Sequence, residues 1–482
     1  MFSNYRKILS LLIFSLALIS SYSFAQNASD ALRLSEIGLG SNARALGMGN
    51  AYYALSDDFS ASSFNPAGFA LLKRMEFAGG LNYSKFNNSA TFFGNKTDYS
   101  NSDTKLDQIS FAFPFPTMRG SLVFAVGYNR DRDFNGALKF NGFNSSNTSM
   151  IQALSGKDDL PYYLFLTDAN GNTPSINGQL NQDGTILSSG SIGRWAFSGA
   201  VEVARNVFVG ATVNVISGNF QRSRDYYEED VKGIYRNVQT DPTEASTLGF
   251  NLFYLNDILD WDISGWDANV GVLYQARTSA NYALRFGADI KFPTSYTVKE
   301  KYTVTGSARF ASVSRDLNDP IVSEVEYDIS TPYVFSGGVA FGYKGLIFSG
   351  GLSFIDYTQM EFSSGLNASD MSYNNKDIKE NFRSTLNYNL GAEYTIPEID
   401  LRVRGGFMLK PSAYKADENT SDFDKKYITG GIGFLVDESF AFDVAYAYGW
   451  WKDLGDNYGT NVSRTYQDIN TNNLVFTFSC RF

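Results

Sequence analysis

The chain has 482 residues, of which 40 are Phe, 30 are Tyr and 5 are Trp, whereas 19% are charged and the formal net charge is −10. So much apolar surface excludes a disordered acidic tail, and the negative charge argues against nucleic acid as a partner. Histidine is absent and Cys480 is the single cysteine, which excludes histidine-dependent catalysis and any intrachain disulfide.

Residues 1–25 have the pattern of a secretory signal peptide. Arg6 and Lys7 precede an apolar run from Ile8 to Ile19, and Ala25 is the small residue expected at a cleavage site. At about 1.5 Å per residue, this run is too short to cross a bilayer core of about 30 Å. We therefore expect export and a mature chain that begins at Gln26.

Residues 26–75 lack the alternation of a strand and are rich in small side chains, which permit close backbone packing. These are Gly38, Gly40, Ala43, Ala45, Gly47, Gly49, Ala51 and Ala54. No strand precedes the glycines, and they lack the G-x-G-x-x-G spacing of a dinucleotide site. Further on, Asn65-Pro66 is a turn initiator. The sequence predicts an N-terminal hatch, or plug, that fills a lumen.

From residue 76 to residue 482, apolar and polar residues alternate with period two. At the end of the chain, for example, Leu474, Phe476 and Phe478 share one face with Cys480 and Phe482. The pattern predicts fourteen strands, near 76–87, 105–114, 119–130, 194–204, 206–222, 267–277, 282–306, 323–342, 345–362, 378–397, 399–411, 425–437, 438–450 and 471–482.

The predicted connections alternate between long and short. A water-soluble β-sandwich would also show alternating strands, but long strands with aromatic ends and alternating loop lengths are typical of outer membrane barrels. A closed sheet also satisfies every backbone group inside a bilayer. We therefore expect an all-β fold, a 14-stranded antiparallel transmembrane β-barrel over residues 76–482. The candidate kink sites are Pro293 and the glycine pairs Gly79-Gly80, Gly337-Gly338, Gly350-Gly351 and Gly405-Gly406.

Three segments resemble the N-terminal hatch of the FadL family of outer membrane transporters for long-chain fatty acids and aromatic hydrocarbons. They are residues 40–51 (GSNARALGMGNA), Ser56-Asp57-Asp58 and Asn65-Pro66-Ala67-Gly68. The resemblance implies a monomeric barrel that takes lipophilic molecules at the cell surface. It also implies sideways release into the membrane through a gap made by a kinked strand. The candidate hatch and gating residues are Asn65, Pro66, Ala67, Gly68, Asp57 and Asp58.

Two long outer loops, near 131–193 and 223–266, are unusually apolar. An apolar solute gains about 25 cal/mol for each Å² removed from water, so an oily cleft would capture it. The candidate ligand-binding residues are Leu154, Leu160, Tyr162, Tyr163, Phe165, Phe250, Phe253, Tyr254, Leu259 and Trp261. Alternatively, these side chains pack the loops on each other as a lid. Lys157 and Arg194 are candidates for binding a carboxylate, with plain surface solvation as the alternative.

The expected function is passive outer membrane transport of hydrophobic compounds in a Gram-negative bacterium. One alternative is a PorV-like barrel that serves protein secretion, which the hatch string also resembles; another is a polar-solute porin. Expected partners are hydrophobic small molecules or lipids, lipopolysaccharide, and the barrel-assembly machinery through Phe482. No catalytic, metal or cofactor site is expected, because Asp168, Asn170 and Asn172 only imitate a calcium loop that lacks its turn glycine.

Overall fold

The structure is a computed structural model that describes residues 26–482, apart from 169, 279–281, 416–419, 438 and 460. The expected signal peptide lies outside the described residues. The helices are α2 (Ala28–Ser35), α3 (Ala43–Gly47), α4 (Ala61–Phe64), α5 (Met150–Leu154), α6 (Leu160–Tyr163) and α7 (Ala368–Asn381), with 3-10 helices η1 (Pro66–Leu71), η2 (Ala245–Thr247), η3 (Tyr357–Gln359) and η4 (Thr420–Asp422).

In the described part of the chain, nineteen strands form one continuous sheet. They are β1 (Glu76–Phe92), β2 (Asn95–Phe115), β3 (Leu122–Asp133), β4 (Gly136–Phe143), β5 (Asn181–Ala204), β6 (Val207–Glu229), β7 (Phe250–Thr278), β8 (Tyr282–Lys291), β9 (Ser295–Phe310), β10 (Ser314–Asp316), β11 (Ile321–Ser330), β12 (Val334–Tyr343), β13 (Leu346–Asp356), β14 (Glu361–Ser364), β15 (Ser384–Ile396), β16 (Leu401–Lys410), β17 (Lys425–Val436), β18 (Phe440–Asp456) and β19 (Arg464–Arg481).

The sheet closes into an antiparallel barrel of fourteen wall strands, as the sequence predicts. The closed circuit runs β1–β2–β3–β5–β6–β7–β8–β12–β13–β15–β16–β17–β18–β19, and β19 pairs back onto β1. The other strands mostly continue a wall strand beyond a break. Pro293 separates β8 from β9 and Pro332 separates β11 from β12, because proline has no N–H to donate to the ladder. The candidate kink at Pro293 is therefore an interruption of a wall strand.

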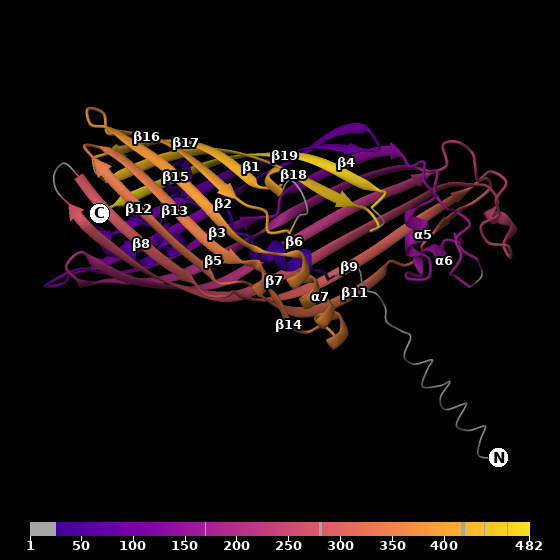
Figure 1. Cartoon of the computed structure of the whole chain (residues 1–482), viewed down its shortest axis with the longest axis horizontal. Coiled ribbons are helices and arrows are strands. Elements are labelled where there is room, and N and C mark those ends of the chain that lie inside the picture. The colour runs from indigo at the N-terminus through magenta and orange to yellow at the C-terminus, as the bar shows by residue number, and fades with distance from the viewer. Residues whose placement is uncertain (1–25, 169, 279–281, 416–419, 438, 460) are drawn as a thin grey trace, which may run out of the picture.

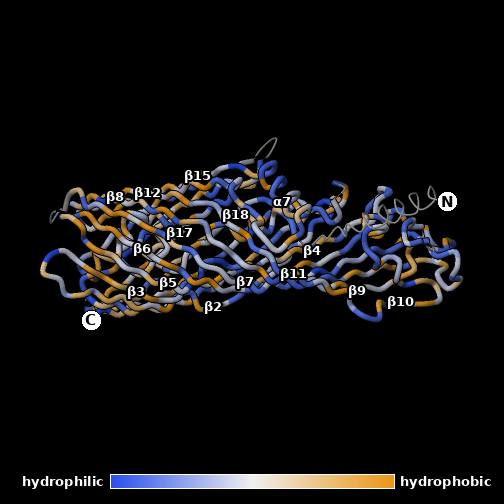
Figure 2. The backbone as a smooth tube through the Cα atoms, turned by 90° about the horizontal axis from the view of Figure 1, so that it is seen from below, coloured by the Kyte–Doolittle hydropathy of each residue, from blue (hydrophilic) through white to orange (hydrophobic). Residues whose placement is uncertain are grey.

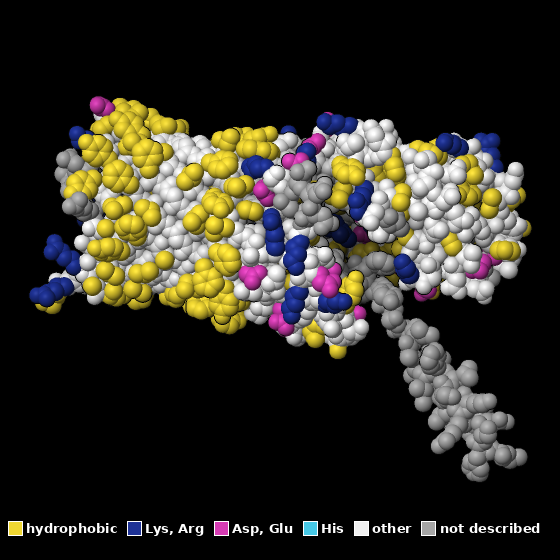
Figure 3. Space-filling model, viewed as in Figure 1, with side chains coloured by type: hydrophobic (Ala, Val, Ile, Leu, Met, Phe, Trp, Pro, Cys, Tyr) yellow, Lys and Arg dark blue, Asp and Glu magenta, His cyan; other side chains and the backbone are white. Residues whose placement is uncertain are grey.

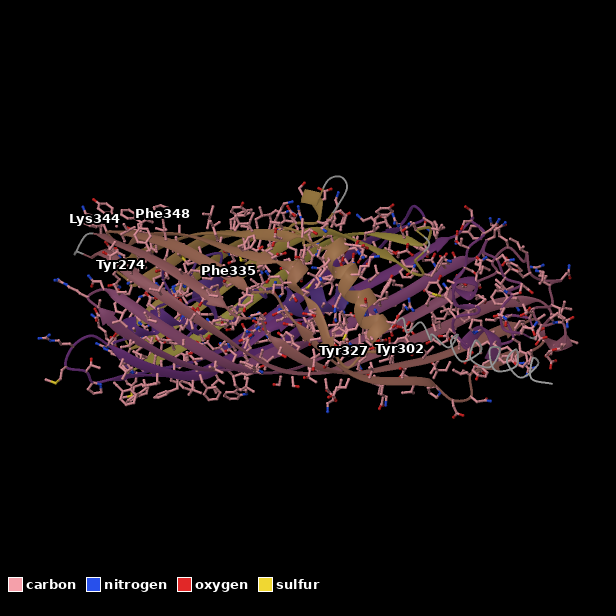
Figure 4. The ribbon with its side chains drawn as sticks, turned by 60° about the horizontal axis from the view of Figure 1, so that its bottom comes forward. Tyr274, Tyr302, Tyr327, Phe335, Lys344 and Phe348 are labelled. Carbon is pink, nitrogen blue, oxygen red and sulfur yellow. The ribbon has the colours of Figure 1, made fainter. Side chains whose placement is uncertain are left out.

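The barrel is a long tube with two different ends (Figure 1). The inner end carries the short connections between strands, such as Ala204 to Val207, and the outer end carries α5 and α6. On the face seen in Figure 3, hydrophobic side chains gather on the half near the inner end, whereas charged side chains lie mainly over the middle and outer parts. Along the tube in Figure 2, hydrophobic residues recur in the strands near the inner end. Tyr274, Phe335 and Phe348 belong to this apolar belt (Figure 4), and each is more than 40% exposed. The belt is the surface expected to face lipid.

The strands extend farther outward than the sequence analysis predicts. Residues 88–104 are an expected loop, yet β1 and β2 run through them and meet at Phe93-Gly94, whose φ angles are 45° and 85°. Such a two-residue turn with both φ angles positive suits a tight hairpin. Large parts of 131–193 and 223–266 are likewise strand. In the other direction, residues 378–381, expected to be strand, end helix α7.

The segment from α2 to η1 lies inside the barrel. The short helix α3 contacts β16, β17, β18 and β19, whereas η1 contacts β3, β5, β6 and β7 on the opposite side of the barrel. A short segment can touch opposing walls only by crossing the lumen. None of the helices in the described part of the chain is both long and apolar enough to cross a membrane.

Candidate functional site

A track of inward-facing glycines on eight consecutive wall strands receives the N-terminal segment. A β-carbon added at any of them would come within 2.0 to 3.3 Å of a hatch atom, from Tyr53 O at Gly287 to Gly47 Cα at Gly431. We call these residues the glycine track: Gly210, Gly271, Gly287, Gly338, Gly351, Gly391, Gly406 and Gly431. Three of the glycine pairs noted in the sequence, Gly337-Gly338, Gly350-Gly351 and Gly405-Gly406, therefore give the hatch room on one side rather than kinking a strand.

The Asn65-Pro66-Ala67 turn is fixed to the wall at β6, β7 and β8. The Asn65 side-chain amide donates to the carbonyl of Tyr53 at 2.9 Å and to the carbonyl of Val272 at 3.0 Å, while its oxygen accepts from Ala67 N at 3.1 Å. Asn65 is fully buried. One side chain thus joins two hatch segments to strand β7, next to Gly68, where a β-carbon would lie 2.0 Å from Ser56 O.

Charged groups attach the opposite side of the hatch to β15, β16 and β18. Arg44 pairs with Asp57 at 2.6 Å and with Glu393 at 3.0 Å. Glu393 also accepts from Arg404, which is fully buried and pairs with Asp443, both at 2.5 Å. Burial alone would raise the pKa of Asp57, but Arg44 and Arg285 outweigh it and hold that pKa below the ordinary value. Asp57 therefore remains a carboxylate that holds the hatch in place.

Asp58, the neighbour of Asp57, has a local structural role. Its carboxylate accepts from Tyr52 Oη at 2.8 Å and from the Ser60 backbone N–H at 2.9 Å. These bonds shape the turn that leads into α4 and keep the buried side chain of Tyr52 satisfied. Within the six predicted hatch residues, Asp57 and Asn65 thus make direct side-chain bonds to the barrel wall, whereas Asp58 acts within the hatch.

A cavity of about 450 Å³ lies beside α2 in the lumen. This volume is within the range of about 300 to 1,000 Å³ typical of small-molecule sites. Its apolar and aromatic lining consists of Leu32, Ile37, Leu39, Phe86, Phe134, Tyr357, Pro411, Ala413, Tyr414, Phe423, Tyr427, Trp451 and Ile469. Trp451 stands at the centre of one wall, with its ring 6.3 Å from both Phe86 and Tyr427. The cavity can therefore accept a hydrophobic molecule against aromatic surfaces.

Two lysines add positive charge to the same cavity. Lys425 Nζ donates to both carboxylate oxygens of Glu36 at 2.7 Å, and Lys410 Nζ donates to the carbonyls of Ile37 and Gly38 at 2.9 Å. Burial would raise the pKa of Glu36, but Lys425, Arg132 and Lys410 together lower it below its usual value. Glu36 is thus a carboxylate of the protein itself that is bound to the ammonium group of Lys425 in the cavity wall.

The wall beside this cavity contains an unpaired seam. Ladder pairing between β2 and β3 ends at Gln108–Asn129, the β3–β5 register shifts at Arg130, and β4 then pairs only with β5. On one side of this border are residues 95–107 of β2, and on the other side are the outer part of β3 and strand β4. We call this border without ladder pairing the seam. Side chains bridge it: Lys105 donates to Gly190 O at 3.0 Å, and Arg130 pairs with Asp107 at 2.8 Å.

The cavity reaches the seam directly, because Ser84, Asp107 and residues 130–135 line the cavity. On the outside, Leu81 and Leu106 are half exposed at the level where the seam begins. The seam is therefore a place in the described wall where the internal cavity, lined by both aromatic and charged side chains, adjoins the outer surface without an intervening backbone ladder. Neither the cavity nor the seam follows from the sequence pattern alone.

The ten predicted ligand-binding residues do not form one cleft. Leu160, Phe250 and Phe253 are buried in a compact cluster at the outer end, with Leu154 packed against it, whereas Leu259 and Trp261 belong to a second cluster around α2. Tyr162 and Tyr163 are about half exposed. Phe165 lies under Arg315, and Tyr254 stacks on Tyr227. We define the first group, with Phe92, Phe140 and their neighbours, as the outer cluster.

Truncation of the outer cluster should loosen the outer end of the tube. Phe253 is fully buried, so Phe253→Ala should cost about 3–5 kcal/mol of local stability through lost burial and an unfilled cavity. We expect faster proteolytic cleavage within residues 150–166 in intact cells. Tyr163→Ala removes an exposed ring and should stay within about 0.5 kcal/mol. Equal cleavage rates in the two variants would contradict a packed outer end.

Arg194 differs from the surface cation considered in the sequence analysis. It is 5% exposed and pairs with Asp267 at 2.5 Å and Asp131 at 3.1 Å. It lines a smaller internal cavity of about 90 Å³ that adjoins the larger one. The cavity residues that sequence reasoning missed are Lys410, Lys425 and Trp451. In the sequence, the only feature that distinguishes these three residues is a cation or a Trp at the end of a segment with alternating apolar and polar residues.

Comparison with known proteins identifies relatives. The family model described as outer membrane protein transport protein (OMPP1/FadL/TodX) matches residues 192–480, more than half of the chain. No curated protein matches at the level of sequence. The Pseudomonas putida toluene transporter TodX is a similar structure, with a TM-score of 0.53 at 12% identity over 92% of this chain and 99% of that one. A Pseudomonas aeruginosa FadL homologue gives 0.54 at 12% identity over 93% and 99%.

Proposed function

Since the chain belongs to the family of outer membrane transport proteins that comprises OMPP1, FadL and TodX, we propose that it carries hydrophobic compounds passively through a plugged barrel and releases them sideways at the inner end of the seam, beside the outward-facing Leu81 and Leu106. Family membership places it in the outer membrane of a Gram-negative bacterium and makes it a transporter rather than an enzyme. Neither the secretion barrel nor the polar-solute porin is favoured.

The observation that carries the proposal is the cavity. It combines aromatic walls, a volume suited to a small molecule, and direct contact with a stretch of wall that has no ladder. An apolar ligand transferred into it leaves water at a gain of about 25 cal/mol per Å². Because the glycine track holds the hatch tightly against much of the wall, the lumen offers no comparable route for ions along that side. Together these features support lipophilic cargo over polar solutes.

We further propose that the hatch gates release. Asn65 joins the hatch to β7, Arg44 joins it to β15 through Glu393, and Asp57 joins it to β8 through Arg285, while residues 36–40 of the same segment line the cavity. A ligand that binds one hatch position better than another shifts the equilibrium between them. Displacement of Glu36 or of the Arg130–Asp107 pair would then open the seam. No energy source is required for movement down a gradient.

The outer end has a separate role in this proposal. Burial of Leu160, Phe250 and Phe253 supports the lid alternative for the apolar loops, because packed side chains offer no surface to a ligand. Tyr162 and Tyr163 are exposed at the outer end and are proposed as first contacts for cargo. We also propose that the chain works as a monomer, contacts lipopolysaccharide around its outer rim, and reaches the barrel-assembly machinery through Phe482.

The relatives suggest two cargo classes. TodX is a toluene transporter, and another similar structure, the CymD monoaromatic hydrocarbon channel, has a TM-score of 0.50 at 14% identity over 92% of this chain and 98% of that one. The lysines of the cavity favour a long-chain acid over a neutral hydrocarbon, since a carboxylate can replace Glu36 on Lys425. We therefore propose amphiphiles with an anionic head as the preferred cargo.

Lys425→Met tests this preference. A hydrogen bond to a charged group contributes about 1.5–3 kcal/mol, so the affinity for oleate should fall by about tenfold to a hundredfold. The affinity for toluene should not change. The neighbouring Lys426 donates to Ser421 O outside the cavity, so Lys426→Met is the matched control. Native mass spectrometry with titrated ligand measures both. Equal loss of oleate and toluene would contradict a head-group role for Lys425.

Trp451→Ala tests the cavity itself. The substitution removes the central aromatic wall, and we expect weaker binding of oleate and toluene alike, by about tenfold or more, because both lose apolar contact area. Trp266→Ala is the control, since Trp266 is 63% exposed on the outside of the barrel. Unchanged binding in Trp451→Ala would place the ligand elsewhere and refute the cavity as the transport site.

A further inference from the structure

The described chain begins inside the barrel, next to a buried carboxylate. Gln26 precedes Asn27, the N-cap residue of α2. The Gln26 side-chain amide donates to Glu300 Oε1 at 2.6 Å. Glu300 lies on β9 and is 3% exposed. The first residue of the expected mature chain therefore lies against the inner face of the wall.

Glu300 has hydrogen-bond donors but no cation. Its other carboxylate oxygen accepts from Trp261 Nε1 and from Tyr327 Oη, both at 2.9 Å; Figure 4 labels Tyr327 on the tube beyond the apolar belt. All three donors are neutral. No lysine or arginine in the described part of the chain forms an ion pair with Glu300. A buried carboxylate without an opposite charge is costly, since several kcal/mol of desolvation are not offset.

A second buried carboxylate increases this excess of negative charge. Asp30 is 2% exposed and close enough to Glu300 for the two charges to repel each other. Asp30 pairs with Arg33 at 2.5 Å, and Arg222, which itself pairs with Asp257, acts on Asp30 from a greater distance. Arg33 is partly exposed. Of the two buried carboxylates, Glu300 is the one without a paired positive charge in the described residues.

Covalent geometry places the α-nitrogen of Gln26 close to the carboxylates of Asp30 and Glu300. Three bonds separate the α-nitrogen of Gln26 from that of Asn27, so the two atoms are at most about 4.3 Å apart. The Asn27 N–H donates to Asp30 Oδ2 at 3.0 Å. The α-nitrogen of Gln26 therefore lies within about 7 Å of the Asp30 carboxylate, on a residue whose side chain already touches Glu300.

We propose that the α-ammonium created by cleavage between Ala25 and Gln26 is the counter-ion of Glu300 and Asp30. A signal peptidase adds water to that peptide bond. Ala25 leaves as a carboxylate, and the Gln26 nitrogen takes up protons to become an ammonium, which is largely charged at neutral pH. In the uncleaved chain the same nitrogen is a neutral amide that cannot balance the two carboxylates.

This ion pair makes processing a step in the assembly of the transport site. Helix α2 follows Gln26 directly, and Ser29, Leu32 and Arg33 of that helix line the cavity. An anchored N-terminus fixes the position of α2 against β9, whereas an uncleaved chain leaves Glu300 without a paired positive charge. The proposal depends on the cleavage position expected from the sequence. It does not depend on which cargo the barrel carries.

Acylation of the N-terminal amine tests the proposal. Mature protein from outer membranes is treated with a water-soluble N-hydroxysuccinimide ester at pH 7, and the N-terminal peptide is followed by mass spectrometry. We expect the amine of Gln26 to react at least tenfold more slowly in the natural protein than in Glu300→Gln. Glu326→Gln is the matched control, because Glu326 is 60% exposed and pairs with Lys299 on the outside. That variant should react like the natural protein.

Three results would overturn the proposal: equal rates in the natural protein and Glu300→Gln, a mature chain that starts at another residue, or a Gln26 cyclised to pyroglutamate. If Glu300→Gln does not fold, the pH profile of acylation in the natural protein decides. An ammonium held by two carboxylates should give a midpoint at least one pH unit above the ordinary value of about 8. A midpoint at or below that value would also refute the ion pair.

Discussion

Gly406→Ala is expected to displace the hatch from the barrel wall, whereas Gly405→Ala, one residue away, is expected to leave the position of the hatch and the stability nearly unchanged. A β-carbon on Gly406 would lie 2.2 Å from Gly49 N and 2.6 Å from Gly49 Cα, both backbone atoms that cannot rotate away. Around Gly405 no atom lies within 4 Å. Overpacking costs about 1–3 kcal/mol, and here the hatch must move as a whole.

Two measurements check this pair of variants. Thermal unfolding in detergent should show a lower midpoint for Gly406→Ala alone. Planar-bilayer recording should show steady ion conductance for Gly406→Ala and none for the natural protein or for Gly405→Ala, because a displaced hatch leaves the lumen to water. If Gly405→Ala and Gly406→Ala behave identically, the hatch does not rest on the glycine track.

Arg404→Met is expected to destabilise the folded barrel by about 3–5 kcal/mol. Arg404 is fully buried and joins Glu393 to Asp443, so its loss leaves two carboxylates with fewer positive charges inside the lumen. Arg44 then remains as the cation nearest Glu393 and is drawn away from Asp57. The Arg44–Asp57 pair within the hatch should therefore weaken along with overall stability.

The double variant Arg404→Met/Glu393→Gln separates charge from packing. Removing the second charge should restore part of the lost stability, by a coupling of 0.5–3 kcal/mol or more. Lys299→Met breaks an exposed pair and should cost at most about 1 kcal/mol. Denaturant unfolding of the natural protein, Arg404→Met, Glu393→Gln and the double variant gives the cycle. A loss in Arg404→Met no larger than that in Lys299→Met would show that the buried network does not hold the structure together.

The sequence predicts the barrel well because period two is a local property. Inward and outward residues alternate along each strand whatever its partners are, so Phe124 and Val126 face outward while Val123 and Ala125 face inward, as expected. Counting the alternating segments gives the fourteen wall strands. The breaks at Pro293 and Pro332 follow from the missing N–H of proline.

The outward extension of the tube was missed for a physical reason. Residues 95–105 of β2 are almost entirely polar on both faces, because this stretch lies beyond the apolar belt and both of its faces meet polar surroundings. A strand without an apolar face has no period-two hydrophobic pattern, so its sequence predicts a loop. In β7, Leu259 and Trp261 do alternate with polar residues, but the expected loop at 223–266 obscured their inward-facing role around α2.

The hatch could be read from its string of small residues, but the cavity could not. Glu36 and Lys425 are 389 positions apart, and the strand tilt and register of the closed sheet decide that they meet. The same holds for Phe86 and Trp451. Tertiary packing also decides which apolar loop residues form the lid and which can contact a ligand. An apolar residue that is buried in the outer cluster has no exposed surface for a ligand to contact.

Uptake by living cells tests the central claim most directly. A Gram-negative host that lacks its own fatty-acid and hydrocarbon transporters is given radiolabelled oleate or toluene, with and without this chain. The account predicts faster accumulation with the natural protein, unaffected by collapse of the membrane potential, and a fall to host background in Trp451→Ala expressed at equal level. Accumulation that never exceeds the host background, or that persists undiminished in Trp451→Ala, would contradict it.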